Sequence, residues 1–118
     1  LTSEELKNYG NLATDLGMEV IYEVHSQQDL DKINDLDNKI IGINNRNLKT
    51  FKVDLDNSIK LADQIPDTSV KISESGISDP RIIMGLKEYG FQGFLIGENF
   101  MKEENPGEAC QNFINHIR

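Results

Sequence analysis

Side chains capable of acid–base chemistry, and glycines able to approach a ligand closely, stand near the ends of four short apolar segments. The segments span 18–25, 40–48, 70–77 and 94–101. A carboxylate there can act as a general acid or base, an amide can orient hydroxyl groups, and an arginine can bind a carboxylate or phosphate bidentately. Because functional residues gather at the carboxyl ends of buried parallel strands, the pattern predicts one site. The candidate residues are Glu23, Asn44, Arg46, Glu74, Ser75, Gly76 and Gly97.

Glu23 is a candidate general acid or base. Successive side chains of a strand alternate between its two faces, so Val20 and Val24 share one face and Glu23 lies on the other. The valines suit a layer of helices, which would direct Glu23 into a partly dry barrel mouth, where a carboxylate can have a raised pKa. An ion pair with a lysine is the alternative role. His25 is a second candidate base, although its place before the helix start at Ser26 favours a surface or hydrogen-bonding role.

The amide, arginine and glycine candidates also have alternative roles. Asn44 shares the inward face with Ile40 and Gly42, but asparagine is common in turns. Arg46 can equally be a surface arginine. Gly76 and Gly97 can cradle a phosphate with backbone N–H groups, or they can simply permit tight turns.

Helical patterns surround the four segments. The alternation of helices and strands predicts a parallel sheet with right-handed crossovers. Half of a (β/α)8 barrel and a complete small doubly wound sheet both satisfy this pattern, and periodicity does not separate them. A short turn of helix is also expected over 98–101. The other expected helix starts are Thr2, Ser26, Asp54 or Asp56, Ser78 before Pro80, and Pro106; the expected stops are Gly17, Pro66 and Gly90.

The segment ends also carry sequence motifs. These are EVH at 23–25, GINNRNLKTF at 42–51, SESGI at 73–77 and FLIGE at 94–98. In this order they resemble the indole-3-glycerol phosphate synthase family, whose members are (β/α)8 (TIM) barrels of tryptophan biosynthesis. A complete barrel needs about 250 residues, and this chain has 118. The resemblance therefore implies that 1–118 is a single domain, the carboxy-terminal half of a barrel with strands 5 to 8 and their helices.

The resemblance also implies a reaction and roles. The complete barrel would be a carbon–carbon lyase, a carboxy-lyase that closes the indole ring of 1-(2-carboxyphenylamino)-1-deoxyribulose 5-phosphate with loss of CO2 and water. No cofactor is expected, and Glu98 receives no role. The implied catalytic residues are Glu23, Asn44, Glu74 and Ser75, and the implied substrate-binding residues are Arg46 for the anthranilate carboxylate and Gly76 and Gly97 for the phosphate.

The family's catalytic lysines and first-strand glutamate are expected in the amino-terminal half, since lysines such as Lys49 and Lys71 do not match them. The chain alone is therefore expected to be inactive and to need that half or self-association. Two alternatives remain. One is a non-catalytic half-barrel that binds phosphate or assembles with a partner. The other is a different phosphate-binding barrel enzyme, such as a phosphoribosylanthranilate isomerase-like protein, against which the EVH and GINNRN motifs argue.

Composition excludes several classes of partner. The formal net charge of -8 argues against binding nucleic acid or an anionic membrane, so a phosphorylated substrate would have to be held by local groups. His25 and His116 are isolated, and no metal site is expected. Cys110 is the single cysteine, which fits a reducing cytoplasm.

Overall fold

Four parallel strands form one sheet in the computed structural model, which describes residues 1–36, 39–46 and 55–117. Their order across the sheet follows their order in the chain, and each strand pairs in parallel with the next. A doubly wound sheet would reverse its strand order, so the predicted half of a (β/α)8 barrel is confirmed. The strands are β1 (Ile21–Val24), β2 (Ile40–Asn44), β3 (Val70–Glu74) and β4 (Phe91–Leu95).

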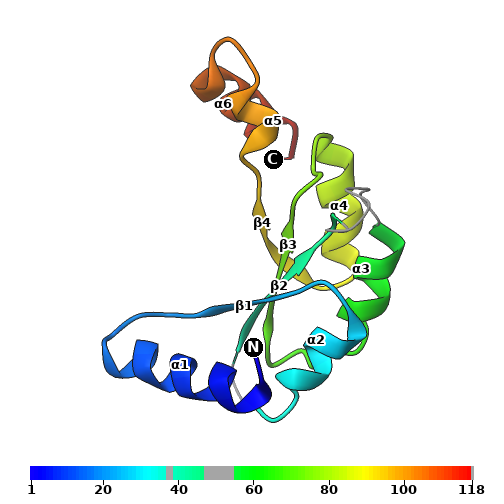
Figure 1. The fold of residues 1–118 in the computed structure, drawn as a ribbon. Coiled ribbons are helices and arrows are strands. Elements are labelled where there is room, and N and C mark those ends of the chain that lie inside the picture. Colours follow the sequence, from blue (N-terminus) through cyan, green and yellow to red (C-terminus); the bar gives the residue numbers. More distant parts are fainter. Residues whose placement is uncertain (37–38, 47–54, 118) are drawn as a thin grey trace.

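Helices cover one side of this sheet. In Figure 1, α2, α3 and α4 lie on the same side of the strands, and α5 and α6 lie beyond the carboxyl end of β4. No helix in the described ranges is long and apolar enough to cross a membrane. The helices are α1 (Ser3–Asp15), α2 (Gln27–Lys32), α3 (Leu55–Ala62), α4 (Pro80–Glu88), α5 (Glu98–Met101) and α6 (Pro106–Ile117).

The two faces of the sheet differ sharply in burial. Val24, Ile41 and Ile43 face the helices and are at most 1% exposed. On the opposite face, Ile21 is 46% exposed and Leu95 is 49% exposed. Apolar residues therefore remain uncovered on the face that would form the inside of a barrel.

Helix α1 also has an uncovered apolar stripe. Leu6 packs against the main core, but Tyr9, Leu12 and Leu16 are each more than half exposed. The predicted helix is present, while its apolar periodicity is not matched by burial within the described part of the chain.

Most predicted helix ends are confirmed. The Thr2 hydroxyl accepts a hydrogen bond from the Glu5 N–H, and the Glu5 carboxylate accepts one from the Thr2 N–H, both at 3.1 Å. Gly17 and Gly90 follow α1 and α4 with φ of +80° and +90°, where glycine is favoured. Asp54, one of two candidate starts for the third helix, lies outside the described residues.

The predicted start of α4 is wrong by one residue. Asp79, not Ser78, is the N-cap, because its carboxylate accepts a hydrogen bond from the Arg81 N–H at 2.9 Å. Pro80 occupies the first turn, as expected.

The fourth strand begins earlier than its apolar run predicts. Lys71 is opposite Phe91 and Ile72 is opposite Gly93, so Gln92 is an extra residue in β4. This irregularity places Phe91 in the helix-covered core and Gly93 on the open face. The helical turn expected over 98–101 is α5.

Candidate active site

A cleft of about 720 Å³ lies at the carboxyl ends of the strands. Six of the seven candidate residues line it, and they come from β1, β3 and the segments that follow β2, β3 and β4. Asn44 is the candidate that does not line the cleft. The lining residues are Glu23, Arg46, Glu74, Ser75, Gly76, Ile77, Ser78, Leu95, Ile96, Gly97, Glu98, Asn99 and Lys102.

Two carboxyl groups meet on the floor of this cleft. Glu74 is 6% exposed, whereas the Glu23 side chain is half exposed, and the two side chains are hydrogen-bonded to each other. Burial, with the neighbouring Glu23 carboxylate, raises the pKa of Glu74 to about 8. The hydrogen bond from Glu74, together with those from His25 and Asn44, lowers the pKa of Glu23. At neutral pH Glu74 therefore holds the shared proton and Glu23 is the carboxylate.

His25 and Asn44 support Glu23 from the side. The His25 Nε2 atom lies 3.0 Å from Glu23 Oε2, while the imidazole is 23% exposed. The side-chain oxygen Oδ1 of Asn44 accepts a hydrogen bond from the Arg46 backbone N–H at 2.9 Å. Asn44 thus shapes the turn after β2 and also contacts Glu23. The hydrogen-bonding role expected for His25 agrees with this geometry.

Arg46 lines the same cleft as the carboxyl pair. Its guanidinium donates to Glu98 Oε2 at 3.0 Å, and Glu98 is largely exposed. The Arg46 Nε atom is buried and has no partner among the described residues. Because an exposed ion pair is weak, an anionic ligand can compete with Glu98 for the guanidinium.

The loop after β3 has an unusual backbone. Ser75 has φ of +68° and Gly76 has φ of +70°, and a side chain is disfavoured in this left-handed region. Gly97 differs, because its φ is −130° and a Cβ atom there would meet nothing within 4 Å. The backbone conformation therefore favours glycine at position 76, whereas Gly97 leaves open space beside the cleft.

Asn45 is a site-supporting residue that was not among the candidates. It is 2% exposed, and its amide nitrogen donates to Ser73 Oγ at 2.9 Å and to the Ser75 carbonyl at 2.8 Å. The Ser58 hydroxyl on α3 donates to the side-chain oxygen Oδ1 of Asn45 at 2.5 Å. Asn45 therefore connects α3 and the end of β2 to the loop after β3, where the Ser75 backbone is in the left-handed region. Strand alternation places Asn45 on the face that the helices cover. A polar side chain there needs hydrogen-bond partners, and this is the feature of the sequence that could have identified Asn45.

Lys102 was also not among the candidates. It follows α5 and lines the cleft, so it and Arg46 are the two cations among the described lining residues. Nothing in its local sequence distinguishes it from other surface lysines. Across 1–36, 39–46 and 55–117, no three His, Cys, Asp or Glu side chains are grouped so that they could hold a metal ion.

Comparisons with known proteins agree on one family. A sequence model described as indole-3-glycerol phosphate synthase matches residues 1–113. A protein of that name from Bacteroides thetaiotaomicron is 50% identical over 120 residues, covering 100% of this chain and 45% of that protein. The Salinibacter ruber protein of that name is 47% identical over 97 residues, covering 82% and 36%. The one from Acetivibrio thermocellus is 44% identical over 113 residues, covering 96% and 44%. The chain thus spans less than half the length of these curated relatives.

Proposed function

The chain belongs to the indole-3-glycerol phosphate synthase family, and from this premise we propose that it supplies part of the active site for ring closure in tryptophan biosynthesis. The substrate would be 1-(2-carboxyphenylamino)-1-deoxyribulose 5-phosphate, and the products indole-3-glycerol phosphate, CO2 and water. The enzyme would be a carboxy-lyase. The observation that carries the proposal is the contact between the buried Glu74 carboxyl group and the half-exposed Glu23 carboxyl group, whose pKa values are shifted in opposite directions, in a cleft that also holds Arg46.

Ring closure with dehydration needs a group that donates a proton and one that accepts it. At neutral pH Glu74 can donate and Glu23 can accept, since their pKa values are shifted in opposite directions. The hydrogen bond between them lets a proton gained by one carboxyl group return to the other. In this proposal Asn44 orients Glu23, which its side chain contacts, and Ser75 holds the substrate beside Glu74.

The anionic ends of the substrate need separate partners. Arg46 would take the anthranilate carboxylate through two hydrogen bonds, displacing the exposed Glu98. The phosphate would lie against the backbone N–H groups of the loops at Gly76 and Gly97, and a Cβ atom on Gly97 would meet nothing within 4 Å. Lys102 would add a positive charge to the same cleft.

We propose that turnover requires further strands. An amino-terminal half-barrel would contribute them, or a second copy of this chain would supply part of them through self-association. Three observations support this. The described residues form a sheet of four strands, the inner face of this sheet is open, and the chain covers less than half the length of the relatives named above. The lysines of this chain do not match the family's catalytic lysines.

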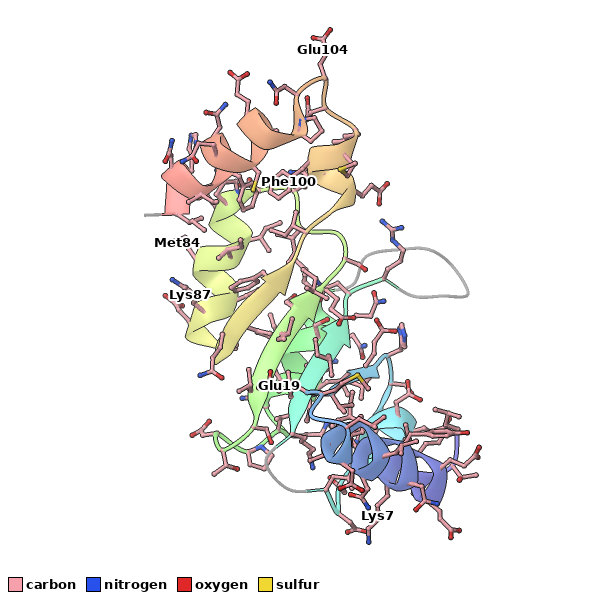
Figure 2. The ribbon with its side chains drawn as sticks, turned by 90° about the vertical axis from the view of Figure 1, so that its left-hand side faces the viewer. Lys7, Glu19, Met84, Lys87, Phe100 and Glu104 are labelled. Atoms are coloured by element: carbon pink, nitrogen blue, oxygen red, sulfur yellow. The ribbon has the colours of Figure 1, made fainter. Side chains whose placement is uncertain are left out.

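Complementation tests the proposal. The chain would be combined with the preceding part of the Bacteroides relative, and formation of the indole product followed by its fluorescence. The assembled barrel should turn over, whereas the separate chain should not. Glu23→Gln should lower kcat roughly 10²- to 10⁴-fold. Glu19→Gln is the control, because Glu19 is exposed on the segment before β1 (Figure 2), and it should leave kcat unchanged. Full activity of the Glu23→Gln barrel would remove Glu23 from the mechanism. Binding of inorganic phosphate without turnover by the assembled barrel would favour a non-catalytic role.

A further inference from the structure

A glycine lies in the middle of β2, on the open face of the sheet. Gly42 pairs with Glu23 on one side and with Ile72 on the other. Glycine weakens a strand, because it loses more conformational freedom on folding and has no side chain to pack. The positive-φ residues of the described chain do not include Gly42, so its backbone does not require glycine. The reason for glycine at position 42 must therefore be the atoms that occupy the space where a side chain would lie, on the open face of the sheet.

The space above Gly42 is filled by the carboxyl group of Glu74. A Cβ atom on Gly42 would overlap Glu74 Oε1, would lie 2.8 Å from Glu74 Cδ, and would lie 3.2 Å from Ile21 Cγ2. Glu74 is two residues beyond Ile72, the β3 partner of Gly42, so its side chain leans back over the middle strand. There it meets Glu23, which comes from the other side of Gly42.

We propose that Gly42 is a positioning residue whose missing side chain forms the seat that holds the Glu74 carboxyl group against Glu23. A methyl group at position 42 would fill this seat. The carboxyl group is the mobile end of a long side chain, so it would swing away before the strands separate. The consequence for catalysis rests on the proposed function, whereas the seat itself does not.

Charged and polar groups surround this carboxyl pair. His25 contacts Glu23 from the segment after β1, and Asn44 contacts it from the end of β2. The Arg46–Glu98 ion pair and Lys102 lie around the same cleft. Position 42 is the place where a single methyl group changes the separation of the two carboxyl groups without altering any of these charges.

Carboxyl titration in the 118-residue chain tests the seat directly. With ¹³C-labelled glutamate, the Glu74 side-chain carboxyl should titrate near pH 8 in the unmodified chain. In Gly42→Ala its pKa should fall by at least one unit toward the ordinary value of 4.5. Gly93→Ala is the matched control, because its Cβ would press on Ile72 Cγ1 at 3.2 Å on the same open face. That control should leave the Glu74 titration unchanged. An unchanged Glu74 pKa in a folded Gly42→Ala chain would overturn the proposal.

A double variant covers the case in which Gly42→Ala fails to fold. Glu74→Ala removes the overlapping atoms, so Gly42→Ala/Glu74→Ala should melt at the temperature of Glu74→Ala alone. A double variant that is as unfolded as Gly42→Ala would show that Glu74 is not what the glycine accommodates, and would also overturn the proposal.

The assembled barrel provides the catalytic measurement. There Gly42→Ala should lower kcat at least tenfold with little change in KM, and it should shift the basic limb of the pH–rate profile to lower pH. If the unmodified assembly has no activity, the proposed function fails, while the titration in the chain still decides the role of Gly42.

Discussion

Replacing Asn45 with aspartate should destabilise the fold by about 3 kcal/mol at pH 7. The change keeps the size of the side chain and keeps the oxygen that accepts from the Ser58 hydroxyl. It removes the amide donor that reaches Ser73 Oγ and the Ser75 carbonyl. The Ser73 hydroxyl can turn and donate to the new carboxylate, but the Ser75 carbonyl has no such freedom.

The magnitude follows from these contacts. A lost hydrogen bond costs about 1 kcal/mol, and leaving the Ser75 carbonyl buried opposite a carboxylate adds about 1–3 kcal/mol. For a chain of this size the melting temperature should fall by roughly 10 °C. Burial should raise the pKa of the introduced aspartate, so its ionisation opposes folding. The loss of stability in Asn45→Asp, relative to the unmodified chain, should therefore be largest above the raised pKa and should become smaller as the pH falls below it.

Thermal and urea unfolding at fixed protein concentration, at pH 4 and pH 7, measure this effect. Asn8→Asp, on the exposed side of α1, is the control and should change the stability by no more than about 0.5 kcal/mol. If Asn45→Asp melts within about 2 °C of the unmodified chain at pH 7, the buried network is not what holds the Ser75 turn.

Three further predictions follow from the site. The raised pKa of Glu74 means that its ionisation lowers stability as pH rises from about 4.5 to about 8; Glu74→Gln should abolish this fall in urea unfolding, and a persisting fall would assign it to another group. Gly97→Val has open space around it, so it should leave the melting temperature nearly unchanged but raise KM in the assembled barrel; an unchanged KM would remove the phosphate from this loop. The uncovered inner face and strand edges should cause self-association at micromolar concentration, which sedimentation velocity would contradict with a folded, strictly monomeric species.

Strand alternation was sufficient to predict which side chains face the helices. Val24 is buried and Glu23 lies in the cleft, as a period of two requires. The start of β4 was predicted too late, at Phe94 rather than Phe91, because Gln92 and Gly93 interrupt the apolar pattern before Phe94. The extra residue in β4 breaks the alternation there, and only the pairing with β3 reveals it. The order of the strands came from the motifs rather than from periodicity.

The sequence identified six of the residues that line the cleft, but not the contacts that they make. Strand ends identified Glu23 and Glu74, but the opposite shifts of their pKa values depend on how deeply each is buried. Asn45 was overlooked beside Asn44, because its partners lie up to 30 residues away in the sequence and one is a backbone carbonyl. Contacts of this kind depend on the tertiary fold and leave no local pattern.

The proton on Glu74 links the acid–base chemistry to the binding of an anionic substrate. The chain carries a formal charge of -8, so its long-range field opposes a phosphorylated ligand. Among the described residues lining the cleft, the charges of Glu23 and Glu98 are balanced by those of Arg46 and Lys102, provided that Glu74 is neutral. Burial of Glu74 against Glu23 therefore does two things at neutral pH. It keeps Glu74 protonated and able to donate a proton. It also keeps the described lining residues free of a net negative charge that would repel the anionic substrate.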